Sequence, residues 1–111
     1  IAGTSAGAMV LTDLVLRPGD VEGPDIQREH TLQGVGLVDN ILLDVHAIAR
    51  NRVLQMIGAK TLYPGRTAIS IDENTAIILT GDRFEVYGRS YVAVYGVPGR
   101  KEPLLFPSAK T

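Results

Sequence analysis

The five residues Gly3-Thr4-Ser5-Ala6-Gly7 have the G-x-S-x-G spacing of a serine nucleophile elbow. In such an elbow a strand turns sharply into a helix, and the serine occupies the apex in a strained backbone conformation, so its neighbours must be small. Ser5 would attack, and the Ala6 N–H at the helix start would stabilise the oxyanion. The pattern predicts nucleophilic catalysis. The alternative is a glycine-rich turn or a phosphate-binding loop without catalysis.

A serine nucleophile needs a general base, and the chain has two histidines, His30 and His46. His46 follows the apolar, strand-like run 41–45, and catalytic groups gather at the carboxyl ends of strands in open α/β sheets. His30 lies in the polar stretch 27–31, which is typical of a solvated surface. We therefore expect His46 to be the base. The alternative for His46 is a structural histidine that bonds backbone groups at a strand end.

The third member of a triad is a carboxylate that orients the imidazole. Asp20, Glu22 and Asp25 are candidates that lie between the serine and the histidine, which gives the order serine, acid, histidine known from other elbow enzymes. Asp44 lies two residues before His46 and therefore on the same strand face, where it can orient the histidine or reach a substrate amine. The residue types and spacings leave these candidates open.

Alternating strand-like and helix-like segments must position these residues, which indicates an α/β fold. Residues 6–11 and 47–57 have helical character, with Gly58 as the expected end of the second helix. Most of 12–31 has no periodicity and is expected to be a loop. The expected strands are 1–3, 41–45, 67–72, 75–80, 83–87 and 91–97, followed by an irregular tail over 98–111.

Composition excludes several classes of protein. The 111 residues carry 11 basic and 12 acidic side chains, a balance that argues against a nucleic-acid or anionic-membrane surface. Because the chain has no cysteine, disulfide scaffolds, thiolate metal sites and cysteine nucleophiles are ruled out. A hydrophobic content of 45% and a charged content of 21% indicate a folded chain rather than a disordered one.

Three segments together resemble the cyanophycinases, in the serine-peptidase family that also holds the aspartyl dipeptidases. They are residues 1–8, then Asp44-Val45-His46 followed by Arg50 and Arg52, then residues 71–76. The resemblance implies a glutamine-amidotransferase-like three-layer sandwich with a mainly parallel sheet and a C-terminal β-hairpin. It also implies an enzyme that uses no metal or cofactor, and we expect a cytoplasmic protein that, as the charge balance indicates, binds neither nucleic acid nor membrane.

The activity implied is hydrolysis of aspartyl or β-aspartyl peptide bonds through a Ser-His-Glu triad. Cyanophycinases cut cyanophycin, an aspartate polymer with arginine on its β-carboxyls, into β-Asp-Arg dipeptides. The resemblance makes Ser5 the nucleophile, His46 the base and Glu22 the acid, with Asp20 as the fallback. The substrate-binding residues that it implies are Asp44, Arg50, Arg52 and Asn74.

Two positions depart from the pattern of the cyanophycin-cleaving members. Val45 stands where they typically have glutamine, and Gln55 stands where they have a third arginine. Losing a polar contact and a positive charge weakens the case for cyanophycin more than the case for peptidase chemistry. In a regular helix Arg50 shares the face of His46, whereas Arg52 points about 200° away from Arg50, which favours Arg50 as the substrate-side charge.

The resemblance also implies that residues 1–111 are the C-terminal half of one peptidase domain that starts at the elbow. The second oxyanion donor would then come from an upstream loop, and we expect weak or no activity from these residues alone. The partners expected are a peptide substrate and either a second copy of the full-length protein or the N-terminal half. The alternatives are a catalytically silent piece with a binding or assembly role, an α-aspartyl dipeptidase-like enzyme, or a different elbow enzyme such as an esterase.

Overall fold

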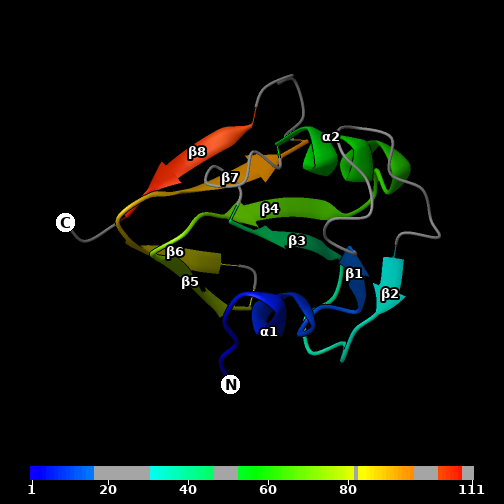
Figure 1. Cartoon of the computed structure of the whole chain (residues 1–111), viewed down its shortest axis with the longest axis horizontal. Coiled ribbons are helices and arrows are strands. Elements are labelled where there is room, and N and C mark those ends of the chain that lie inside the picture. The colour runs from blue at the N-terminus through cyan, green and yellow to red at the C-terminus, as the bar shows by residue number, and fades with distance from the viewer. Residues whose placement is uncertain (17–30, 47–52, 82, 97–102, 109–111) are drawn as a thin grey trace.

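The computed structural model describes residues 1–16, 31–46, 53–81, 83–96 and 103–108 (Figure 1). Two helices lie in these ranges, α1 (Ala6–Met9) and α2 (Val53–Leu62). The strands are β1 (Leu14–Leu16), β2 (Thr31–Gln33), β3 (Ile41–Val45), β4 (Thr67–Ile71), β5 (Thr75–Thr80), β6 (Arg83–Gly88), β7 (Tyr91–Tyr95) and β8 (Leu104–Pro107). Neither described helix has the length and apolar character of a membrane span. Because helices and strands occur together in one chain and pack against each other, the described residues form an α/β fold.

A four-stranded sheet in the order β3-β4-β7-β8 forms the centre of the fold. Strands β3 and β4 are parallel, with Ile41 opposite Thr67 and Val45 opposite Ile71. Parallel neighbours need a crossover connection, and α2 lies in the segment that supplies it between β3 and β4. Both strands therefore end at the same edge of the sheet.

Alternate side chains of the central sheet pack into two apolar clusters. On one face Leu42 and Ala68 pack with Met56 and Ala59 of α2. On the other face Leu43 and Ile69 belong to a cluster that includes Val86 of the β5–β6 hairpin. Because it is covered on both faces, β3 is a nearly continuous apolar run rather than an alternating one.

The central sheet is mixed, whereas the resemblance implied a mainly parallel one. Among the described strands only β3 and β4 are parallel, and the β4–β7 and β7–β8 pairs are antiparallel. The β5–β6 hairpin lies between β4 and β7 in the chain and brings β7 back alongside β4 in the opposite direction. Such a return needs no helical crossover, so the neighbouring strands become antiparallel.

Several other elements differ from the sequence predictions. Residues 1–3, predicted as a strand, do not form one, because no described strand pairs with them. The tail predicted as irregular contains β8, which pairs with β7. The segment predicted as mostly loop contributes β1, which pairs with β2 over three residues, too few to produce a detectable alternation. Helix α2 does not end at Gly58 but continues to Leu62, because Gly58 is buried inside it rather than exposed at its end. The first part of the predicted helix, 47–52, lies outside the described residues.

The Asp13–Arg66 ion pair joins the segment after α1 to the segment after α2. Arg66 donates two hydrogen bonds to the Asp13 carboxylate, of 2.7 and 2.9 Å. These bonds hold the pKa of Asp13 below its ordinary value and raise the pKa of Arg66. A carboxylate with a lowered folded-state pKa stabilises the fold above its unfolded-state pKa, and this stabilisation disappears as the pH falls through the folded-state value.

Asp13→Asn should therefore lower the free energy of unfolding at pH 7 by about 1 kcal/mol or less, since the pair is partly exposed. The difference from the wild-type chain should shrink once the pH falls below the ordinary aspartate pKa, and it should vanish only below the lowered pKa of Asp13. Urea unfolding at pH 7 and at about pH 3 measures both values, where the acid condition lies below the ordinary aspartate pKa. A difference that is the same at both pH values would contradict this assignment.

Candidate active site

Ser5 occupies the turn that opens α1, in a backbone conformation that L-residues rarely adopt. Its φ is 51° and its ψ is −123°, and the turn is closed by a 2.8 Å hydrogen bond from the Gly7 N–H to the Thr4 carbonyl. A non-glycine residue in this region is strained by about 1–3 kcal/mol. This geometry is the strained apex that the G-x-S-x-G spacing predicted.

The two glycines of the elbow have different surroundings, which gives a matched pair of variants. A Cβ on Gly3 would lie 2.4 Å from the Gly7 carbonyl oxygen, whereas a Cβ on Gly7 would meet nothing within 4 Å. Gly3→Ala should therefore displace Ser5 and slow its reaction with a fluorophosphonate by about 100-fold, the cost of a 1 Å misplacement. Gly7→Ala should react at the wild-type rate. Equal rates for the two variants would contradict this reading of the turn.

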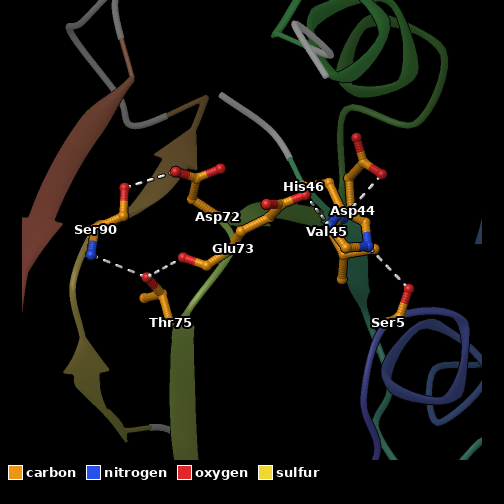
Figure 2. A network of polar contacts seen from close by, with 8 residues as sticks. All are labelled: Ser5, Asp44, Val45, His46, Asp72, Glu73, Thr75 and Ser90. Atoms are coloured by element: carbon orange, nitrogen blue, oxygen red, sulfur yellow. Dashed lines mark hydrogen bonds and ion pairs between the residues drawn. The ribbon is translucent and has the colours of Figure 1, made fainter. Parts of the chain in front are cut away.

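His46 directly follows β3 and faces the elbow. Its Nε2 lies 2.9 Å from the Ser5 Oγ, although 41 residues separate the two in the chain (Figure 2). The His46 side chain is 22% exposed, and its backbone φ is 57°, a turn conformation that ends the strand. The structure thus brings together the serine and the histidine that the sequence analysis selected. His30 lies outside the described residues.

The second ring nitrogen of His46 bonds to Glu73. The His46 Nδ1 and the Glu73 Oε1 are 3.0 Å apart (Figure 2). Glu73 follows β4, and because β3 and β4 run parallel with their last residues, Val45 and Ile71, in register, the residues that follow them meet at one edge. An ionised carboxylate only accepts hydrogen bonds, so Nδ1 carries the proton and Nε2 is left to accept the Ser5 hydroxyl proton.

Sequence reasoning did not select Glu73 as the partner of the histidine. It placed the acid between Ser5 and His46, at Glu22 or Asp20, both of which lie outside the described residues. The signal that could have found Glu73 is the same carboxyl-end rule that selected His46, applied to the next parallel strand. The three hydrogen-bonded residues follow one another along the chain in the order Ser5, His46, Glu73.

Backbone strain is concentrated around these three side chains. The described residues include four non-glycine residues with positive φ, and three of them are Ser5, His46 and Asn74, the last with a φ of 54°. Asn74 is exposed and follows Glu73, and its carbonyl accepts a hydrogen bond from the Arg89 N–H. Strained non-glycine residues cluster at functional sites because the surrounding structure must enforce them.

Asp44 lies in the interior, beneath the end of β3. Its side chain is 2% exposed, and its Oδ1 accepts a 2.9 Å hydrogen bond from the Val45 N–H. Burial raises the pKa of the nearby Tyr95 phenol, and the charge of Asp44 raises it further. This position favours a structural role for Asp44 over the substrate contact that the resemblance implied. Val45, at the position where the resemblance implied glutamine, is also buried.

The remaining predicted site residues divide into two groups. Ala6 lies in the described residues, where its exposed N–H at the start of α1 donates to no described acceptor. Arg50 and Arg52 lie outside the described residues. Within the described parts of the chain no group of three histidine, aspartate or glutamate side chains is arranged to hold a metal ion.

A family profile, curated sequences and a solved structure are all similar to this chain, and all of them are peptidases or cyanophycinases. The profile of peptidase family S51 matches residues 1–87. The chain is 32% identical over 96 residues to a cyanophycinase from Synechococcus elongatus and 33% identical over 96 residues to one from a Nostoc species. Its fold is similar to the crystal structure of a peptidase from an acI-B1 Actinobacterium, with a TM-score of 0.64 and 27% identity.

The similarity extends over most of this chain but over a smaller part of the relatives. The matched segment is 85% of this chain, and it is 30% of the Synechococcus relative and 32% of the Nostoc relative. The structural match covers 96% of this chain and 42% of the actinobacterial peptidase. The chain therefore spans about a third of the length of the curated relatives.

Proposed function

Since the chain belongs to peptidase family S51, we propose that Ser5, His46 and Glu73 are the catalytic triad of a serine-type peptidase. The single observation that carries the proposal is the hydrogen-bonded chain from Glu73 through His46 to Ser5. These three residues come from the ends of two parallel strands and from the elbow, so nothing local in the sequence holds them together. Glu73 takes the role that the sequence analysis gave to Glu22.

In this mechanism the Ser5 Oγ attacks the carbonyl carbon of the scissile peptide bond while the His46 Nε2 takes the hydroxyl proton. The tetrahedral oxyanion is stabilised by the Ala6 N–H. When the intermediate collapses, the C–N bond breaks and His46 returns the proton to the leaving amine. A water molecule, deprotonated by His46, then hydrolyses the acyl-Ser5 ester and regenerates the serine. Throughout, Glu73 holds the Nδ1 proton and stabilises the imidazolium.

The substrate class that we propose is an aspartyl or β-aspartyl peptide. Both curated relatives described above are named cyanophycinases, and Arg50 and Arg52 would supply positive charge for an aspartyl carboxylate next to the base. Asn74, exposed beside Glu73, would add a polar contact. The departures at Val45 and Gln55 weaken the case for the arginine-bearing polymer, so short aspartyl peptides are included among the proposed substrates.

The test is a comparison of two substrates with one variant. The wild-type chain is assayed on the β-Asp-Arg polymer and on short Asp-X dipeptides, with release of amine as the measurement. Arg50→Ala should raise KM for both substrates by roughly 10- to 100-fold, because a charge-assisted contact worth about 1.5–3 kcal/mol is lost. Unchanged turnover of both substrates by Arg50→Ala would remove Arg50 from the site. Hydrolysis of other peptides by the wild-type chain, but of neither of these two substrates, would contradict the proposed substrate class.

We also propose that the active unit includes a further protein partner, either a second copy of the full-length protein or an N-terminal half. Exposed apolar side chains lie beside the elbow on paired segments, since the Val35 N–H bonds to the Val10 carbonyl and both side chains are exposed. Such residues give a partner an apolar surface to cover. Sedimentation of the chain alone and with an N-terminal half measures this association.

A further inference from the structure

The position of Glu73 has to be maintained by its backbone, because its side chain is largely in solvent. The side chain is 47% exposed, and within the described residues its hydrogen-bond partner is His46. An exposed glutamate samples several rotamers, and ordering it costs free energy that a single hydrogen bond barely offsets. The turn between β4 and β5 must therefore be fixed if the carboxylate is to remain within bonding distance of His46.

Figure 2 shows that the turn between β6 and β7, which contains Ser90, is hydrogen-bonded to the turn between β4 and β5. The Thr75 hydroxyl donates a 3.0 Å hydrogen bond to the Glu73 carbonyl and accepts one of 3.1 Å from the Ser90 N–H. On the other side of Glu73, the Ser90 hydroxyl donates a 2.6 Å bond to the Asp72 carboxylate. Asp72 and Thr75, which lie on either side of Glu73 in the chain, are thus both bonded to Ser90.

The close approach of the two turns is built into the backbone. Gly88 pairs with Thr75 at the end of the β5–β6 ladder, and a Cβ on Gly88 would lie 2.2 Å from the Asn74 carbonyl oxygen. The φ of Gly88 is +132°, which side-chain-bearing residues rarely adopt. The same Asn74 carbonyl accepts a hydrogen bond from the Arg89 N–H. A glycine at this point allows the second turn to reach the first.

We propose that Thr75, with Ser90, is a positioning residue for the catalytic carboxylate: its hydroxyl locks the backbone of Glu73 in the orientation that aims Oε1 at His46. The proposal rests on the proposed function for its catalytic consequence, but the geometry that it predicts can be measured without turnover. Thr75 is suited to the role because one hydroxyl donates one hydrogen bond and accepts another at the same time.

The decisive comparison is Thr75→Val against Thr75→Ser. Valine keeps the shape and β-branching of threonine but has no hydroxyl, whereas serine keeps the hydroxyl. Thr75→Val should lower kcat, or the rate of Ser5 modification by a fluorophosphonate, by about 10-fold or more with KM unchanged, and Thr75→Ser should restore it. Thr80→Val, the same change at an exposed position of β5, is the control and should behave as wild type.

A double-variant cycle separates positioning from mere stabilisation of the turn. If Thr75 acts through Glu73, Thr75→Val should cause no further loss in a Glu73→Gln background. An equal loss in both backgrounds, or a loss that Thr75→Ser fails to restore, would overturn the proposal. If Thr75→Val does not fold, Ser90→Ala removes the Asp72 contact instead and is expected to show the same dependence on Glu73.

Proton NMR of the chain distinguishes failure of this inference from failure of the proposed function. The His46 Nδ1 proton, bonded to Glu73, should give a downfield signal in the wild-type chain and in Thr75→Ser, and the signal should be lost in Thr75→Val. A retained signal in Thr75→Val would overturn the positioning role, as would its absence from the wild-type chain. A wild-type signal without any modification of Ser5 would contradict the proposed function and leave the positioning role in place.

Discussion

Glu73→Gln is expected to lower kcat/KM for an aspartyl peptide by about 10⁴-fold, the loss seen when the carboxylate of a serine-protease triad becomes an amide. The physical reason is the tautomer of His46. Glutamine can donate a hydrogen bond to Nδ1, which moves the ring proton to Nε2, 2.9 Å from the Ser5 Oγ. A protonated Nε2 cannot accept the serine proton. Initial rates over a range of substrate concentrations measure the loss.

Glu22→Gln is the variant that discriminates between the two acids. If Glu73 is the triad acid, Glu22→Gln should retain wild-type kcat/KM within about 2-fold, because Glu22 then has no part in orienting His46. Glu85→Gln, an exposed carboxylate on β6, serves as the control. A large loss in Glu22→Gln with little change in Glu73→Gln would return the acid to the segment between Ser5 and His46.

Replacing Ser5 has the largest expected effect on activity, and replacing it with glycine should also relieve the backbone strain of the elbow. Ser5→Ala and Ser5→Gly should each lower kcat by about 10⁶-fold, as removal of a serine-protease nucleophile does. The alanine variant keeps the strained φ of 51°, whereas glycine adopts it freely. The free energy of unfolding should therefore be about 1 kcal/mol higher for Ser5→Gly than for Ser5→Ala, because a strained non-glycine residue costs about 1–3 kcal/mol.

The measurements are residual activity and urea unfolding on the same preparations. The alanine variant is the matched control for the glycine variant, since both lack the hydroxyl and differ only in backbone freedom. Equal unfolding free energies would mean that the elbow stores no strain at Ser5. Residual activity near the wild-type level in either variant would remove Ser5 from the mechanism.

Long, strongly patterned elements of the fold were predictable from the sequence, and short ones were not. The apolar run of β3 and the β5–β6 hairpin on either side of Gly81 were predicted at or within one residue of their observed bounds. Strands β1, β2 and β8 have three or four residues each, and pairing with a neighbour rather than local pattern defines them. The helix end at Gly58 failed because burial inside α2 outweighs the low helix propensity of glycine.

In the candidate site, Ser5 and His46 were predictable from the sequence, because few residues could fill their roles, and Glu73 was not. Ser5 sits in a five-residue motif, and His46 was one of two histidines, so each could be selected from spacing and position. Glu73 is one of 12 acidic residues, and its role depends on the parallel pairing of β3 with β4, which no local pattern reveals. The proposed role of the Thr75 hydroxyl is harder still to predict, since it depends on a hydrogen bond from Ser90, which is 15 residues away in the chain.

The most direct measurement is the stoichiometry of fluorophosphonate labelling of the folded chain, with the labelled residue identified by mass spectrometry. Because the reagent reacts with an activated serine and needs no substrate-binding residues, it tests the Ser5–His46–Glu73 arrangement itself. The proposed mechanism predicts one equivalent of label on Ser5, none on Ser5→Ala, and labelling of His46→Ala slowed by about 10⁴-fold or more. A folded wild-type chain whose Ser5 takes no label, or labels as fast in His46→Ala, would contradict the mechanism.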